Sequence, residues 1–448
     1  MDSSVFLDFR LPNATTWVYF SFVLTIALFF QFGRLLTIRN LDLLTLFLLA
    51  PGFLLLQDAH GVFQGDPTSA RAGREITLAY AWLIAGSGYW FARTIVDLAL
   101  VRRPALGTNL SPAGLGWLGL ALFVCLTAAA VRRDTATETV HVGKQPAPLS
   151  QVQEGAAVVV EHAQNGTGNH VPAAEVRFWV ERVLSLVCHV AVIVALLLIC
   201  RSHFQDWTAG MATASLYVLL PYTAFNVGQF HHVWPTVFLM WAVFWYRRPT
   251  VSGSLLGVAA GSSFFPLLLF PLWFGFYSKR GAGRFGIAFL GATAVSVGLM
   301  AVVLWWDGRM GSSVAAALHL SDWQPWKVPR TESLWTGAHW AYRLPIFVIY
   351  VAFLIGVTFW PSPKNLSHLV ALSAAVLLGV QFWYADRGGV YVLWYLPLVL
   401  LVIFRPNLTG AEPPLIEPGA GVMVRLAGKA WRRVRPGGAN PSSKELAV

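Results

Sequence analysis

Two acidic residues and a histidine follow the second long apolar stretch of the sequence. Asp58, His60 and Asp66 lie in the segment DAHGVFQGDPTSARAGRE, residues 58–75. A carboxylate in this position could act as a general base or hold a divalent cation, and His60 could relay a proton. The spacing matches no particular metal site. Because acidic residues also mark where an apolar helix meets water, a purely structural role is the alternative.

A second polar group interrupts the apolar segment PYTAFNVGQFHHVWP, residues 221–235. It consists of Asn226, Gln229, His231 and His232, and Gly228 among them permits close backbone approach. Polar groups at membrane depth are costly unless they are paired, so they tend to face a cavity or a site. The alternative is a short polar turn outside the membrane. Adjacent histidines point in different directions on a helix, which makes them a poor metal pair.

A third group combines aromatic and charged residues in the segment 307–342. Its members are Trp323, Trp326, Trp335, Trp340, Asp322, Lys327, Arg330 and Glu332, followed by Arg343. Aromatic faces beside charged groups suit a sugar ring or a lipid phosphate. An amphipathic segment lying on the bilayer surface would also be rich in Trp and Arg. Asp386 and Arg387 form a further charged turn, ADRGG, with a plain tight turn as its alternative.

The composition indicates that these residues are positioned by membrane helices. Of 448 residues, 56% are hydrophobic and only 12% are charged, whereas soluble proteins carry roughly 25% charged residues. The mean hydropathy is +0.59. The 20 Trp residues are typical of membrane interfaces. The net charge of +11 lies mainly in short loops and the C-terminal tail, so we expect no nucleic-acid partner.

The three cysteines, Cys125, Cys188 and Cys200, lie within apolar stretches and are expected to be small core residues.

The apolar stretches predict an all-α fold, a polytopic bundle of about 13 membrane segments at roughly 20 residues per crossing. We expect helices at 16–33, 41–57, 76–98, 113–131, 182–200, 209–225, 233–246, 251–263, 265–278, 285–306, 343–360, 366–384 and 390–404. The segments 233–246, 251–263 and 265–278 are short, and one or two of them are expected to be re-entrant or half-helices. Near the end of 76–98, Arg93 and Asp97 should form a structural pair, with Arg93 reaching the headgroups.

Basic residues in alternate connections predict the orientation of the chain. They are Arg34, Arg39, Arg102, Arg103, Arg201, Arg247, Arg248, Lys279, Arg280, Arg284, Lys364, Arg405 and several residues of the tail. The positive-inside rule assigns this side to the cytoplasm, with the N-terminus outside and the C-terminus inside, as in a bacterial inner membrane. The N-terminal segment lacks a signal-peptide pattern, so the first helix should be retained.

The same orientation divides the chain into a membrane domain, 1–405, and a flexible basic cytoplasmic tail, 406–448. It places two long loops of the membrane domain outside the membrane. These are the polar segment 132–176, which we expect to be disordered, and the aromatic segment 307–342.

Residues 225–272 resemble a family of GT-C-fold glycosyltransferases, the polyprenyl-phosphate-mannose-dependent mannosyltransferases. The resemblance rests on the pair Gly228-Gln229, the apolar segment Val233–Tyr246, the basic turn Arg247-Arg248-Pro249, and then Gly253, Gly257 and Pro266. Two features differ from the family pattern. The usual Asn after the Gly-Gln pair is replaced by His231 or His232. The Lys before the proline is absent, and Ser262, Ser263 or Phe264 takes its place.

The resemblance implies a GT-C-like membrane enzyme that moves a sugar from a polyprenyl-phosphate donor at the extracytoplasmic face. Its partners would be membrane lipid and the lipid-linked sugar. By position, Asp58 would be the catalytic base, with Asp66 second and His60 beside them. The expected substrate-binding residues are Gln229, His231, His232, Trp323, Trp326, Lys327, Arg330, Arg343 and Arg387. Asp58 or Asp66, Gln229 and the segment 307–342 should then line one outward-facing cavity.

Two other functions remain open at this stage. A transporter or flippase for a lipid or small molecule would need ionisable residues near mid-membrane. His189 is the clearest of these, with Asp42 and Asp97 near helix ends. The other hypothesis is a non-catalytic membrane protein on the same scaffold, because the lysine that precedes the proline in the family pattern is missing.

Overall fold

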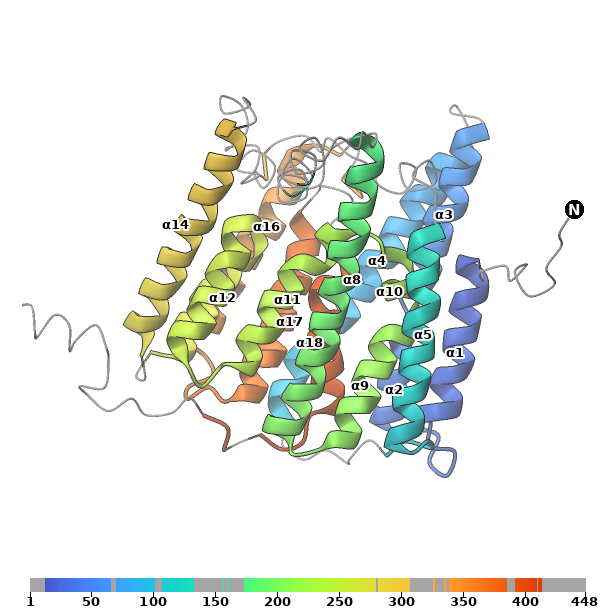
Figure 1. Cartoon of the computed structure of the whole chain (residues 1–448), viewed down its shortest axis with the longest axis horizontal. Helices are drawn as coiled ribbons and strands as arrows, with labels where there is room; N and C mark the ends of the chain where they lie inside the picture. Colours follow the sequence, from blue (N-terminus) through green and yellow to red (C-terminus); the bar gives the residue numbers. More distant parts are fainter. Residues whose placement is uncertain are drawn as a thin grey trace, which may run out of the picture.

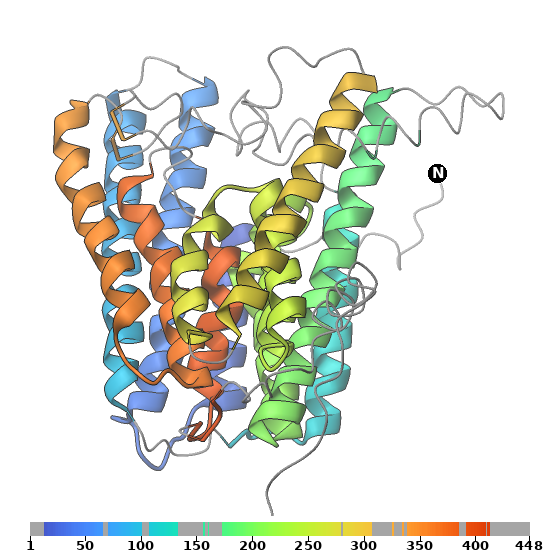
Figure 2. The ribbon, with the colours of Figure 1, turned by 90° about the vertical axis from the view of Figure 1, so that its left-hand side faces the viewer.

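The computed structural model shows a bundle of helices that run roughly side by side (Figures 1 and 2). It describes residues 13–65, 70–100, 107–132, 156, 160, 173–278, 281–306, 325–326, 334–335, 338–384, 391–408 and 410–412. No β-strand occurs among these residues. The all-α class expected from the sequence is therefore confirmed for the described part of the chain.

The main helices follow the apolar stretches. They are α1 (Ala14–Phe29), α2 (Ile38–Thr45), α3 (Ala50–Gly65), α4 (Ala70–Val96), α5 (Pro112–Arg132), α8 (Ala173–Ile199), α9 (Trp207–Leu219), α10 (Pro221–Asn226), α11 (Phe230–Phe244), α12 (Pro249–Ser262), α13 (Phe270–Phe276), α14 (Ala282–Trp306), α16 (Arg343–Phe359), α17 (Leu366–Trp383) and α18 (Val392–Phe404). Short helical turns lie at Asp97–Ala99, Cys200–Phe204, Phe265–Leu269 and Trp340–Tyr342.

Several elements differ from the sequence expectation. The helix expected at 41–57 is divided into α2 and α3 by a turn at 46–49. The helix expected at 209–225 is divided at Leu220, whose extended backbone precedes Pro221, the first residue of α10. Helix α8 begins at Ala173, well before the expected start at 182, so the loop expected at 132–176 ends in a helix. Most of that loop lies outside the described residues.

Six helical segments of the described chain are long and apolar enough to cross a membrane. They are Ile38–Val62, Pro112–Val131, Glu175–Phe204, Ala282–Val302, Trp340–Phe359 and Leu366–Trp383. Ala14–Phe29, Phe230–Phe244, Phe265–Phe276 and Val392–Phe404 are shorter apolar helices. These segments support a polytopic membrane protein, and the count of about 13 crossings remains a prediction.

Burial separates the centre of the bundle from its periphery. The most apolar part of α17 is 89% buried, whereas the corresponding parts of α5, α14 and α16 are 22% buried. Nearly every side chain of α18 is also buried. Peripheral helices instead expose large apolar side chains, such as Trp117 on α5 and Ile287 on α14. Apolar side chains on the outside are expected where the surrounding medium is lipid.

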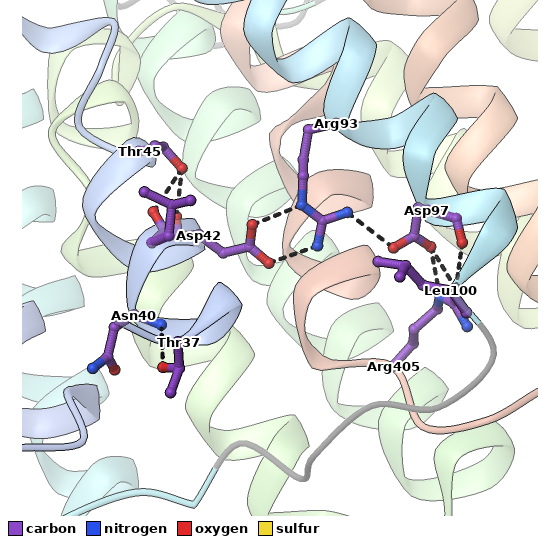
Figure 3. A network of polar contacts seen from close by, with 9 residues as sticks. Thr37, Asn40, Asp42, Thr45, Arg93, Asp97, Leu100 and Arg405 are labelled. Atoms are coloured by element: carbon purple, nitrogen blue, oxygen red, sulfur yellow. Dashed lines mark hydrogen bonds and ion pairs between the residues drawn. The ribbon is translucent and has the colours of Figure 1, made fainter. Parts of the chain in front are cut away.

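A buried ion network joins α2, the end of α4 and the residue after α18 (Figure 3). Arg93 contacts both carboxylate oxygens of Asp42 at 2.7 Å and Asp97 at 3.1 Å. Arg405 contacts Asp97 at 2.6 Å, and both of these side chains are at most 4% exposed. The expected Arg93–Asp97 pair is confirmed. Arg93 is only 9% exposed, so the expectation that it reaches the headgroups is wrong, because Asp42 binds it inside the bundle.

The network marks the lower end of the bundle in Figure 1, where α2 and the connection from α8 to α9 lie. Contacts bring other connections to the same end. Arg39 donates a hydrogen bond to the carbonyl oxygen of Phe29 at 3.1 Å and another to that of Gly107. Arg405 also donates to the carbonyl oxygen of Leu100 at 3.1 Å. Arg39 and Arg405, two of the basic residues predicted for one side of the membrane, thus lie at the same end.

Helices α12 and α14 pack closely because α12 presents glycines at four-residue intervals. A side chain added at Gly253 or Gly257 would overlap the backbone of Phe285 or Phe289, and one at Gly261 would overlap Ser296. The hydroxyl of Thr293 donates to the carbonyl oxygen of Gly257 at 3.0 Å. Small residues at this spacing allow two membrane helices to approach through their backbones.

Candidate functional site

The Gly228-Gln229 pair lies at a break between two helices. Helix α10 ends at Asn226, and Gln229 has extended backbone angles immediately before α11. Asn226, Gln229, His231 and His232 are all at least nine-tenths buried. We call residues 226–232 the helix junction. Its polar side chains lie inside the bundle, so this segment is not an exposed polar turn.

The junction is recessed relative to neighbouring helices. Figures 1 and 2 show α3, α8 and α14 extending beyond the upper ends of α11 and α12. Helix α8 passes the junction, and the Ser185 hydroxyl donates to the carbonyl oxygen of Val227 at 2.8 Å. Ser185 is twelve residues after Ala173, the first residue of α8, or about 18 Å along a helix with a rise of 1.5 Å per residue.

Arg182 of α8 is buried against the junction. Its side chain is fully buried, and its guanidinium lies 4.8 Å from the centre of the Phe178 ring. A Cβ atom at position 228 would overlap the Nη1 atom of Arg182. Glycine is therefore required at position 228 for the guanidinium to occupy this place.

A row of five aromatic rings begins at the junction and crosses to α18. The rings of His231 and His232 are 4.3 Å apart, and that of Tyr391 is 5.3 Å from His232. Tyr391 stacks on Trp394 at 3.8 Å with an interplanar angle of 5°, and Phe265 stacks on the same indole. We call these five residues the aromatic row. It joins the beginnings of α11 and α18 to the segment after α12.

Two buried polar atoms, one in the aromatic row and one two residues before Phe265 in the chain, have no hydrogen-bond partner among the residues that the structure describes. They are the indole Nε1 of Trp394 and the hydroxyl of Ser263. Ser263 follows α12 directly, while its neighbour Ser262 accepts a hydrogen bond from Trp234 at 2.9 Å. An unsatisfied buried polar group costs about 1–3 kcal/mol. Such groups beside aromatic rings are suited to a ligand that carries hydroxyl oxygens.

Two of the predicted catalytic residues, Asp58 and His60, lie on α3. Asp58 is exposed, and Arg71 of α4 is close enough for its charge to interact with that carboxylate. A ring nitrogen of His60 is 2.6 Å from the carbonyl oxygen of Leu56, one turn earlier. Helix α3 packs on the junction side of the bundle through Phe53, whose ring is 5.8 Å from that of Phe225. Asp58 is five residues beyond this contact, or about 7.5 Å along the helix.

The other predicted site residues divide into two groups. Trp326 is 55% exposed, and Arg343 is buried and donates two hydrogen bonds to the carbonyl oxygen of Pro325, at 3.1 and 2.8 Å. Arg343 thereby attaches part of the aromatic loop to the start of α16. Asp66, Trp323, Lys327, Arg330 and Arg387 lie outside the described residues. The predicted convergence of Asp58, Gln229 and the aromatic loop on one cavity remains a prediction.

Sequence reasoning missed Arg182 and the partner of His189. The helix was expected to begin at 182, and Arg182 was not singled out. It lies instead inside α8, nine residues after Ala173, and its side chain is fully buried. His189 is buried and hydrogen-bonded to the Tyr217 hydroxyl at 2.8 Å. Among the described residues, no three His, Cys, Asp or Glu side chains are placed to hold a metal ion.

Comparison with protein-family models, curated proteins and solved structures finds no significant match. The class of the protein therefore follows from its helices and their composition. Six apolar segments of membrane-crossing length, with apolar side chains on the periphery, indicate an integral membrane protein. The function has to be inferred from the buried polar residues at the helix junction.

Proposed function

We propose that this protein is an integral membrane glycosyltransferase that takes a sugar from a polyprenyl-phosphate donor. The helix junction is the observation that carries the proposal. It is a break between two apolar helices, and Asn226, Gln229, His231 and His232 are buried around it. Helices interrupted at membrane depth and buried polar residues typically occur where they form a substrate site.

The surroundings of the junction support a sugar as the transferred group. Aromatic rings bind the apolar faces of sugars, and hydrogen-bond donors bind their hydroxyls. The aromatic row supplies the rings, and Trp394 and Ser263 supply buried polar atoms without partners in the described structure. A flat hydrocarbon ligand would leave both of these polar atoms unsatisfied, so they favour a hydroxyl-rich ligand.

The proposed reaction is a direct displacement at the anomeric carbon of the sugar. The oxygen of an acceptor hydroxyl forms a bond to this carbon, and the bond from the carbon to the phosphate oxygen breaks. The electron pair leaves with polyprenyl phosphate, and the hydroxyl proton passes to a carboxylate acting as general base. Asp58 is the proposed base, because α3 packs on α10 and carries Asp58 toward the upper end.

The distribution of basic residues supports a site on the extracytoplasmic face. Arg39 and Arg405 lie at the lower end of the bundle, which the positive-inside rule assigns to the cytoplasm. The helix junction and Asp58 lie away from that end. This orientation places the N-terminus outside and the C-terminus inside a bacterial inner membrane.

A proton-coupled transporter receives less support from the structure. Its candidate ionisable residues have structural partners: Asp42 and Asp97 belong to the ion network, and His189 is bound to Tyr217. Residues that bind and release protons during transport would have to leave these partners. We therefore place transport second.

The proposal can be tested with purified protein in lipid nanodiscs. Radiolabelled polyprenyl-phosphate-mannose and polyprenyl-phosphate-glucose would be supplied with a membrane extract as acceptor source, and released polyprenyl phosphate would be measured. We expect turnover of one donor, and loss of turnover in Asp58→Asn and Gln229→Ala. Glu75→Gln is the matched control, because Glu75 is also a neighbour of Arg71. Unchanged turnover in Asp58→Asn would exclude Asp58 as the base, and no turnover of either donor would count against the proposed function.

A further inference from the structure

Arg182 is a positive charge buried on α8, directly after Glu181. A buried charge is costly, and its retention requires a partner or a functional use. The guanidinium does not simply lie along the surface, since the side chain is fully buried and packs on Phe178. Its place beside Gly228 brings it to the proposed substrate site.

Three features set the position of the guanidinium. The absence of a side chain at Gly228 provides the space, and the Phe178 ring supports the guanidinium at 4.8 Å. The hydrogen bond from Ser185 to Val227 holds α8 against the junction one turn further along. A guanidinium has planar donors whose geometry matches two oxygens of a phosphate group. Holding it in advance reduces the entropy lost when an anion binds.

The outer face of α8 suits a lipid-linked ligand. Trp179, Val183 and Val187 are exposed on this helix, at 43%, 54% and 59%. Arg182 is adjacent in sequence to Val183 but is directed to the interior. A polyprenyl chain lying in lipid along α8 would therefore have a buried cation on the other side of the same helix.

We infer that Arg182 binds the phosphate of a polyprenyl-phosphate ligand at the helix junction. This inference deepens the proposed function and rests on it for the identity of the lipid. Helix α12 ends at the neutral Ser262 and Ser263, so it supplies no cation at this point. Arg343 is bound to the carbonyl oxygen of Pro325. Arg182 thus supplies positive charge from α8, and Gly228 controls its position.

The test compares two lipids that differ only in the phosphate. Binding of a short-chain polyprenyl phosphate and of the neutral polyprenol would be measured in nanodiscs by thermophoresis. The wild type should prefer the phosphate. Arg182→Gln should lower phosphate binding by about 10- to 100-fold, the range for losing charge-assisted hydrogen bonds, and leave polyprenol binding unchanged. Gly228→Ala should lower the same preference without removing the charge, because the added Cβ displaces the guanidinium.

Gly33→Ala is the matched control for Gly228→Ala, because no atom lies within 4 Å of a side chain added at position 33. An equal loss of both lipids in Arg182→Gln would show a structural role and overturn the inference. An unchanged preference for phosphate over polyprenol in both Arg182→Gln and Gly228→Ala would also overturn it.

Inorganic phosphate is the competitor that distinguishes a lipid phosphate from free phosphate as the ligand. We expect no competition at millimolar concentration, and full competition would overturn the lipid assignment. If the wild type prefers the phosphate lipid but transfers no sugar, the proposed glycosyltransferase activity is refuted and the role of Arg182 is still supported.

Discussion

Removing the Asp97 carboxylate should strongly destabilise the protein. The side chain of Asp97 is fully buried and lies between Arg93 and Arg405 (Figure 3). In Asp97→Asn, Arg93 keeps its two contacts with Asp42, whereas Arg405 loses its charged partner and keeps hydrogen bonds to the carbonyl oxygens of residue 97 and Leu100. Burial, and to a smaller extent Arg93, lowers the pKa of Arg405 to about 10, so this side chain is still charged at neutral pH.

The magnitude follows from the charge left inside the bundle. The four side chains Asp42, Arg93, Asp97 and Arg405 together carry two positive and two negative charges, and the substitution leaves a net charge of +1. Breaking a buried ion pair by removing one partner costs about 3–5 kcal/mol. We expect about 3 kcal/mol, the lower limit, because the carbonyl oxygens still accept hydrogen bonds from Arg405. Removing both partners in Asp97→Asn/Arg405→Gln should recover a large part of this loss.

The free energy of unfolding would be measured by titrating SDS into mixed micelles and following helix content by circular dichroism. Glu75→Gln is the control, since it breaks the partly exposed pair of Arg71 and Glu75, and such pairs contribute little. A double-mutant cycle isolates the coupling between Asp97 and Arg405. The reasoning is refuted if Asp97→Asn is as stable as Glu75→Gln, or if the double variant is no more stable than Asp97→Asn.

Three further substitutions test the packing and the site. Gly257→Leu should separate α12 from α14 and cost several kcal/mol in the same unfolding assay, whereas Gly291→Leu has free space and should cost much less. Trp394→Phe keeps a ring against Tyr391 but removes the unpaired Nε1. It should lower affinity for the sugar-bearing donor more than affinity for polyprenyl phosphate, at some cost in stability because the smaller ring leaves a cavity. Ser263→Ala should also lower affinity for the sugar-bearing donor more than affinity for polyprenyl phosphate. If either variant weakened binding of the two lipids equally, the assigned sugar contacts would be contradicted.

Local sequence patterns were sufficient to locate the helices. Each long apolar stretch contains a helix, because a chain in lipid must satisfy its backbone hydrogen bonds within the segment. The glycine spacing of α12 was also visible, although the sequence did not show that these glycines pack on α14. The breaks at 46–49 and at Leu220 were missed, because hydropathy stays high through both turns.

The candidate site was only partly predictable. Gln229, His231 and His232 stood out because polar residues are rare in apolar sequence, and all three are buried at the helix junction. The neighbour of this junction, Arg182, could not be inferred, since its contact with Gly228 joins helices that are far apart in the chain. Asp58 was chosen by position along the chain, and the contacts of its helix with α10 are a finding of the structure alone.

The sequence by itself determined that the chain is helical, apolar over long segments and asymmetric in its basic loops. These properties depend on residue type and short-range spacing, which are read directly from the chain. Only the tertiary structure decided which polar residues meet. Arg93 and Asp42 are 51 residues apart, and Arg405 and Asp97 are 308 apart. Such pairs form because distant helices pack side by side, and a helix's own periodicity carries no information about which neighbour it will have.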